Sequence, residues 1–230
     1  MFQLTFTLRD RLAELPISDV GREALERQLE EIDKTLGERF HSYIENSMVG
    51  ILYKLQNCDC SFFKDQEKAL VFVNFIAHQY FRTPMLRNVV ARIEHEIPNL
   101  DLNRIWLIES HIYATNIGAG IFVERSDYRF ACLENKTEKP FITGDQSVIN
   151  LNTEKDKELR LYMPLSPSLA IIFTRDVSIP NTKIVKAASS IEVEYYNQMI
   201  YRNSADQIYS NNRNYLTEVS KSAKNILAAY

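Results

Sequence analysis

The chain has 230 residues, a formal net charge of −3 at pH 7, 25% charged residues and 45% hydrophobic residues. This composition is typical of a globular protein with a substantial core. It excludes a long disordered chain and a chain-wide basic surface for nucleic acid, although a local basic patch stays open. The length fits a single domain over residues 1–230.

Cysteine usage and hydropathy bear on the location of the protein. Cys58 and Cys60 stand too close together for an ordinary disulfide, and no second motif completes a zinc site, so we expect reduced thiols. The N-terminus lacks the continuous apolar run of a signal peptide, and no apolar window is fit to span a bilayer. We therefore expect a cytoplasmic protein without membrane segments.

The N-terminal half of the chain predicts long helices. Residues 2–8 alternate between apolar and polar as in a short strand, although Leu8, Leu12 and Leu15 also suit a helix. A long amphipathic helix is expected from Val20 to about Asn57, with a weak point at Gly37 or Gly50. We expect its apolar stripe to bury against the next helix, with a dimer seam as the alternative. The stripe consists of Leu25, Leu29, Ile32, Leu36, Phe40 and Ile44.

Two further helical segments follow. Residues 64–97 are dense in apolar side chains, and Pro84 predicts a kink or break near Arg82-Thr83, because proline lacks the amide hydrogen and clashes with the preceding turn. A third helix is expected over 103–123. Small residues within it indicate that another helix packs closely: Ala114, Gly118 and Ala119.

From Tyr128 the apolar period changes to that of strands. Residues 128–134 and 141–143 are predicted to pair, and strands follow at 159–163 and 169–173, which gives a small sheet within 128–175. Residues 181–230 return to helical spacing, at 191–201, 205–209 and 215–227. The predicted fold class is α+β, with long N-terminal helices, a small, mostly antiparallel sheet in the middle and C-terminal helices.

Four sequence motifs occur in a characteristic order. They are FIAHQYFRTP (75–84), FITGDQSVI (141–149), PLSP (164–167) and YYNQMIYRNSADQIYS (195–210). Together they resemble the bacterial family known as domain of unknown function 4238, over about residues 40–210. The resemblance implies that characteristic polar positions of that family are here Gln79, Arg82, Asp145, Ser166 and Asn197, and that Glu45 matches a helical glutamate.

The chain departs from the family pattern in three places. Gly144 stands where serine is usual, and Ser147 stands where proline is usual. The N-terminal opening of the family, H-x-x-P-x-x-[YF]-L, has no counterpart in this sequence. The family carries no established activity, so the resemblance informs the fold more than the function.

The candidate catalytic residues are Glu45, Gln79, Arg82 and Asp145. Glu45 and Asp145 could bind Mg²⁺ or Mn²⁺, and Arg82 could bind a phosphate through two N–H groups. Ser166 and Asn197 are candidates for other binding roles. These residues suggest an effector or defence-type protein that hydrolyses nucleic acid or a nucleotide with a metal. The alternative is a non-catalytic binding or regulatory module, in which Arg82 caps the broken helix and pairs with Asp145.

Other patterns in the sequence give weaker indications of function. Asp145 with Glu158-Leu159-Arg160 is similar to a nuclease arrangement, but arginine is a poor general base. The four histidines are scattered, and we interpret His78 as a core residue. Tyrosines near basic residues at the C-terminus could stack on nucleic acid, although core packing is favoured: Tyr195, Tyr196, Tyr201, Tyr209 and Tyr215 with Arg202, Arg213, Lys221 and Lys224. A homo-oligomer or a protein partner through the helices is also considered.

Overall fold

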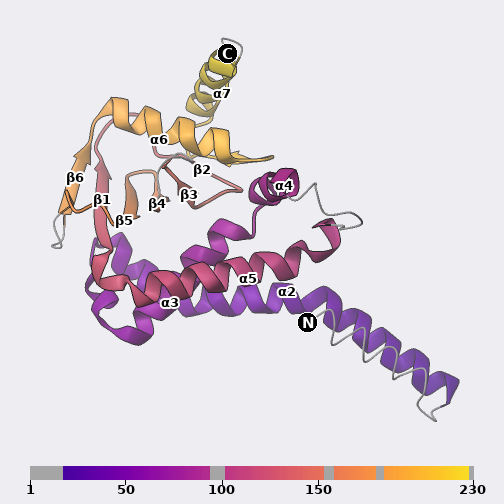
Figure 1. The fold of residues 1–230 in the computed structure, drawn as a ribbon. Helices are drawn as coiled ribbons and strands as arrows, with labels where there is room; N and C mark the ends of the chain where they lie inside the picture. Colours follow the sequence, from indigo (N-terminus) through magenta and orange to yellow (C-terminus); the bar gives the residue numbers. More distant parts are fainter. Residues whose placement is uncertain (1–17, 94–101, 153–157, 180–183, 228–230) are drawn as a thin grey trace.

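The computed structural model describes residues 18–93, 102–152, 158–179 and 184–227. In these ranges the chain forms three layers (Figure 1). One layer holds α2 (Asp19–Gln56), α3 (Gln66–Phe81) and α5 (Leu102–Val123), and a five-stranded sheet lies above it. The opposite face of the sheet is covered by α6 (Ser190–Asn203), with α7 (Arg213–Leu227) packed against α6. The predicted α+β class is confirmed.

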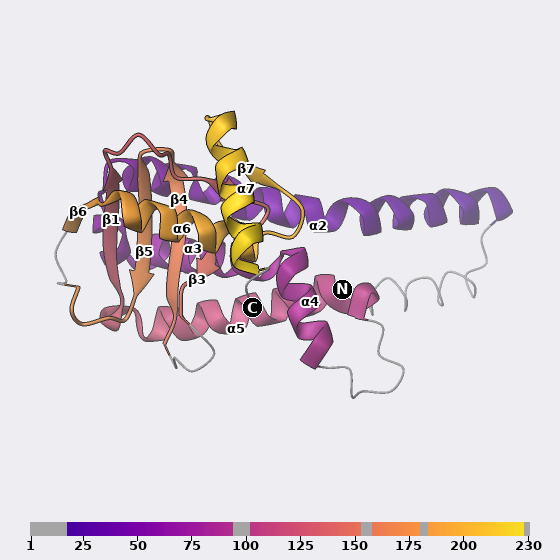
Figure 2. The ribbon, with the colours of Figure 1, turned by 90° about the horizontal axis from the view of Figure 1, so that it is seen from above.

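Helix α2 confirms the predicted long N-terminal helix. It begins after Ser18, whose Oγ accepts a hydrogen bond from the Gly21 amide at 3.2 Å, and it runs through Gly37 and Gly50 without a break. Its N-terminal half extends beyond the three layers (Figure 2). Its C-terminal half buries one apolar stripe in the core: Ile44, Met48, Ile51 and Leu55. The strand expected at 2–8 lies outside the described residues.

The predicted break near Pro84 is also present. Helix α3 ends at Phe81, and α4 (Pro84–Ile93) begins at the proline. Pro84 has no amide hydrogen to continue the α3 ladder, yet its fixed φ suits the first position of a new helix. Helix α5 lies close to α3, because a Cβ at Gly118 would stand only 3.4 Å from the Val73 carbonyl oxygen. The expected close helix packing is therefore found.

The sheet has the strand order β3-β4-β5-β1-β6. Strand β1 pairs antiparallel with β5 and parallel with β6. The predicted pairing of residues 128–134 with 141–143 was wrong. After β1 the chain turns away, held by Asn135 Nδ2 donating to the Lys139 carbonyl at 2.6 Å. The strands are β1 (Arg129–Asn135), β3 (Ile149–Asn150), β4 (Arg160–Ser166), β5 (Leu169–Thr174) and β6 (Ile184–Ala188).

Two short elements correct the C-terminal prediction. Strand β6 falls in the region expected to be helical, and the segment 205–209, also expected to be helical, contains strand β7 (Ile208–Tyr209). β7 pairs antiparallel with β2 (Thr143–Gly144). The reason is tertiary, because Asp145 binds three backbone amides of residues 205–207 and holds them in a turn.

Alternating residues of the sheet fill two separate cores. On one face Phe130, Cys132 and Phe173 pack against α2 and α3. On the other face Tyr162 stacks on Tyr196 of α6, with ring centroids 4.7 Å apart. Burial on both faces explains the continuous apolar run of β5. No helix among the described residues has the length and hydropathy that crossing a bilayer requires.

Candidate polar site at the α3–α4 break

The break between α3 and α4 carries a polar cluster. Arg82 is the C-cap residue of α3, and its Nη1 donates to Glu45 Oε1 of α2 at 2.7 Å. Gln79 Nε2, one turn earlier on α3, donates to the same oxygen at 3.3 Å. The side chains of Arg82 and Glu45 are 37% and 47% exposed, so the pair is accessible to solvent. Three of the four candidate catalytic residues therefore come together.

The segment after β2 packs onto this break and contributes residues that sequence reasoning did not single out. Ser147 Oγ donates to Gln79 Oε1 at 3.2 Å. Gln146 is buried, and its Nε2 donates to the carbonyls of Tyr80 at 3.2 Å and Val148 at 2.6 Å. Thr83 Oγ1 donates to Gln146 Oε1. In the sequence, Gln146 and Ser147 are marked only by their place in the GDQSV motif. In the structure this motif lies next to the Q-Y-F-R-T-P motif.

Asp145, the fourth candidate, is bound elsewhere. Its carboxylate accepts from the amides of Ala205 at 2.9 Å, Asp206 at 2.7 Å and Gln207 at 3.3 Å. Within the described residues Arg82 forms its ion pair with Glu45, and the Arg82–Asp145 pair considered above is not formed. The two carboxylates considered as joint metal ligands are thus engaged in different contacts.

Three histidines from three helices gather beside the polar cluster. His41 of α2 and His78 of α3 each lie 5.3 Å from His111 of α5, measured between ring centroids, and Phe40 contacts all three rings. His78 is only 2% exposed, and its Nδ1 donates to the Asn74 carbonyl at 2.8 Å. The proton on Nδ1 leaves a lone pair on His78 Nε2, which has no hydrogen-bond partner among the described residues.

These surroundings keep the imidazoles neutral. Burial lowers the pKa of His78. Burial is also the main cause that lowers the pKa of His111, to about 4, and the nearby His78 and His41 contribute to this shift. Burial is the main cause that lowers the pKa of His41. The nearby Arg82 and His78 lower it further, whereas Glu45 raises it. At pH 7 the cluster therefore presents neutral rings next to the Arg82 cation. Sequence reasoning missed it because the three histidines are more than 30 positions apart.

The motifs found in the sequence now stand in one connected arrangement. The end of α3, the segment after β2 and the turn at 205–207 are joined through Gln79, Gln146 and Asp145. A family model described as Protein of unknown function (DUF4238) matches residues 18–214. The chain belongs to the DUF4238 family. Comparisons with curated proteins and with solved structures gave no significant match.

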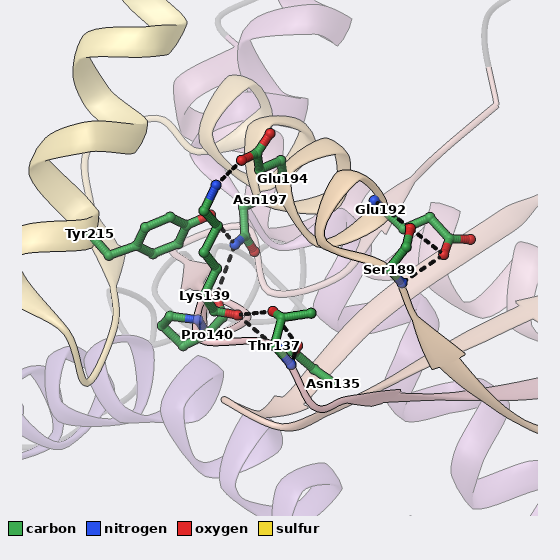
Figure 3. A network of polar contacts seen from close by, with 9 residues as sticks. All are labelled: Asn135, Thr137, Lys139, Pro140, Ser189, Glu192, Glu194, Asn197 and Tyr215. Atoms are coloured by element: carbon green, nitrogen blue, oxygen red, sulfur yellow. Dashed lines mark hydrogen bonds and ion pairs between the residues drawn. The ribbon is translucent and has the colours of Figure 1, made fainter.

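In this DUF4238 protein Asn197 is fully buried. It lies between Pro140 and Tyr215 (Figure 3). Its Nδ2 donates to the Pro140 carbonyl at 2.8 Å and to Tyr215 Oη at 3.0 Å. Its Oδ1 accepts from the Ile142 amide at 3.0 Å. Both amide hydrogens are used, so Asn197 joins α6, α7 and the segment after β1 and keeps no donor for a ligand.

Ser166 lies at the turn between β4 and β5. Its Oγ contacts Ser168 Oγ at 3.2 Å and accepts from the Ser168 amide at 3.3 Å. It also lines a surface cavity of about 520 Å³ together with Asn135, Lys136 and Gln56. No contact between Ser166 and the Glu45–Arg82 pair is present among the described residues.

The other candidate sites of the DUF4238 chain are dispersed. Among the tyrosines considered for nucleic acid, Tyr196 and Tyr215 are buried in the core, while Tyr195 and Tyr209 are about half exposed. The amide of Arg160 donates to Asn150 Oδ1, and Asp145 is bound to the 205–207 turn, so the nuclease-like arrangement is not assembled by these contacts. Within the described ranges no three His, Cys, Asp or Glu side chains are grouped to hold a metal ion.

Proposed function

We propose that the protein hydrolyses a phosphate-bearing substrate, a nucleotide or a nucleic acid, at the α3–α4 break. The observation that carries this proposal is the meeting of neutral imidazoles with an accessible guanidinium at one place on the surface. Groups that accept a proton at pH 7, placed beside a group that binds anions, are what hydrolysis of a phosphate ester requires.

Arg82 is proposed to bind the phosphate. Its guanidinium has five N–H donors in a planar fork, of which Nη1 donates to Glu45. Glu45 fixes the orientation of the fork, and Gln79 in turn donates to Glu45. The remaining donors can form the paired hydrogen bonds that phosphate oxygens accept. Glu45 and Gln79 act as positioning residues in this scheme.

His41 is proposed as the general base. It is the ring of the cluster whose pKa is directly affected by both Arg82 and Glu45, and it is partly exposed. The water oxygen forms a bond to phosphorus, the bond from phosphorus to the leaving oxygen breaks with its electrons, and the proton of the water passes to a ring nitrogen of His41. A positioned base of this kind contributes about 10²- to 10⁴-fold to the rate.

The experiment described below tests whether hydrolysis requires a divalent cation. Mg²⁺ is commonly bound through one or two carboxylates together with the phosphates of the substrate. Glu45 is the carboxylate next to Arg82, whereas Asp145 accepts three backbone hydrogen bonds and takes a structural role in this scheme. Mg²⁺ or Mn²⁺ bound through Glu45 would supply charge neutralisation of the phosphates.

A second candidate function is a non-catalytic binding or regulatory module. It is favoured by the way the polar groups satisfy one another, since Glu45, Gln79, Arg82 and Ser147 form one chain of hydrogen bonds between α2, α3 and the segment after β2. In that case the cluster holds the layers together, and a ligand that binds to Arg82 is held without being changed.

The test combines binding and turnover. Purified protein is incubated with nucleoside mono-, di- and triphosphates and with short RNA and DNA oligonucleotides, each with Mg²⁺, with Mn²⁺ or with EDTA. Thermal melting reports binding, and chromatography of the products reports hydrolysis. We expect turnover of at least one substrate, a loss of 100-fold or more in His41→Asn with binding retained, and weaker binding in Arg82→Lys.

The matched control is Arg27→Lys, because Arg27 forms an exposed ion pair with Glu23 in the N-terminal half of α2, which extends beyond the three layers (Figure 2). It should leave melting, binding and turnover unchanged. A ligand-induced shift without turnover in the wild type would support the binding module instead. No shift and no turnover with any substrate, while all variants are folded, would overturn the proposal.

A further inference from the structure

The outer face of α5 is unusual for an exposed helix surface. Residues 110–123 include no Asp, Glu, Lys or Arg. Ile112 is 52% exposed and Val123 is 76% exposed, and Asn116 and Ala119 between them are exposed as well. A helix that is apolar on all sides is normally buried on all sides.

These four exposed residues have the spacing of a helix-pairing seam. The steps from Ile112 to Asn116, Ala119 and Val123 are four, three and four residues, which is the alternation of the a and d positions of a coiled coil. The close contact with α3 is made by Gly118 on the opposite side, against Val73 and Ala77.

Gly120 adds an independent observation. A Cβ at Gly120 would meet no atom within 4 Å, and the residue is exposed. Glycine in the interior of a helix is destabilising, because it loses more backbone entropy on folding than other residues. Gly118 is explained by its contact with α3, whereas no contact with the described residues explains Gly120. A second helix backbone approaching this face would explain it.

We propose that the outer face of α5 pairs with α5 of a second copy in an antiparallel, two-fold symmetric arrangement. The pattern is its own complement in that orientation, because a two-fold axis between residues 117 and 118 exchanges Ile112 with Val123 and Asn116 with Ala119. The face has no charge that would repel its copy. A neutral seam also offers no charge with which to select a partner of a different kind.

The size of the seam sets its strength. Three turns of one helix cover roughly half of the ~800 Å² that each partner contributes to a standard interface. We therefore expect a reversible dimer with a dissociation constant in the micromolar range.

The oligomeric state tests this proposal. Sedimentation equilibrium of the full chain from about 5 to 500 µM should show a monomer–dimer equilibrium. Ala119→Glu, which places a charge in the seam of both copies, should leave only monomer. Asn116→Leu should shift the equilibrium at least tenfold toward dimer, because it removes a polar group from the seam. Ser47→Glu, at an exposed position of α2, is the matched control and should behave as the wild type.

Orientation is tested by disulfide formation in a Cys60→Ser background. Asn116→Cys chains mixed with Ala119→Cys chains should form a cross-linked dimer, more than either variant by itself. A wild type that is monomeric at 500 µM would overturn the proposal, as would an Ala119→Glu dimer of unchanged strength. None of these readouts depends on catalysis, so this proposal and the proposed function can fail separately.

Discussion

At the scale of single residues, the histidines show how position in space changes the role of a side chain. His41, His78 and His111 belong to three different helices, and each would be unremarkable alone. Burial lowers the pKa of every ring, and neighbouring histidines lower the pKa of His41 and of His111 further. The Asn74 carbonyl fixes the tautomer of His78, so its unprotonated Nε2 lies within the buried part of the group.

This arrangement predicts a loss of stability in mild acid. The unfolded chain binds protons at its histidines below about pH 6.5, while His111 in the folded protein binds one only near pH 4. The free energy of unfolding is therefore fully retained above pH 6.5 and falls as the pH drops from 6.5 to 4. We expect His111 to account for about 1–2 kcal/mol, a figure reduced for its partial exposure.

Urea unfolding at pH 8, 7, 6, 5 and 4 measures this dependence. His111→Gln should flatten the slope between pH 6.5 and 4. Thr115→Gln, an exposed change on the same helix, should preserve it. The charged groups that face the histidines are Arg82 and Glu45. A slope that is identical in His111→Gln and in the wild type would contradict the prediction.

At the scale of elements, the segment after β2 connects parts of the chain that are far apart. Gly144 of β2 has no room for a side chain, because a Cβ there would lie 2.9 Å from the Gln207 carbonyl oxygen and would collide with Ser204 Oγ. A side chain at position 144 would therefore require residues 204 and 207 to shift. Asp145, the next residue, closes the turn at 205–207 through its carboxylate.

Asp145→Ala should therefore destabilise the protein without removing a ligand site. Three backbone amides lose a charged acceptor, and because the region is partly exposed and water can replace it in part, we expect a loss of about 1–3 kcal/mol. The matched change is Asp206→Ala, an exposed acidic residue in the same turn, which should cost less than about 0.5 kcal/mol. Chemical denaturation measures both, and equal losses in the two variants would exclude this role for Asp145.

At the scale of the whole molecule, the sheet is shared by two cores. The faces of β1, β4 and β5 alternate between the core below, built with α2 and α3, and the core above, built with α6 and α7. Both helical layers pack against this one five-stranded sheet. A sheet buried on both sides couples the two layers, because loss of either layer exposes one of its apolar faces.

This coupling predicts a single unfolding transition. Trp106, the only tryptophan, is buried in α5, a helix of the layer on one side of the sheet, and Val193 is fully buried in α6, which covers the other side. Val193→Ala should lower the midpoint of the Trp106 fluorescence transition by about 3–8 °C, as much as it lowers the midpoint from circular dichroism. Ile191→Ala, exposed on the same helix, should change neither midpoint by more than about 1 °C. Two separate transitions would show that the layers unfold independently.

The sequence by itself determined the features that depend on neighbouring residues. Apolar spacing predicted α2 and α5, and the missing amide hydrogen of Pro84 predicted the break after Arg82. Alternation predicted β4, a continuous apolar run predicted β5, and the order of the motifs predicted the DUF4238 family. Each of these sequence patterns depends on residues that are close together in the chain. It can therefore be recognised without knowing which other segments pack against it.

Only the tertiary structure decided which distant groups meet. It paired β1 with β5 and β6, formed β7 from a segment with helical spacing, and bound Asp145 to backbone amides while Glu45 paired with Arg82. It also brought the three histidines together. These outcomes depend on competition among residues that are far apart in the chain. Burial and geometry set the contact energies of the competing pairs, and the local spacing of residues in the sequence specifies neither burial nor geometry.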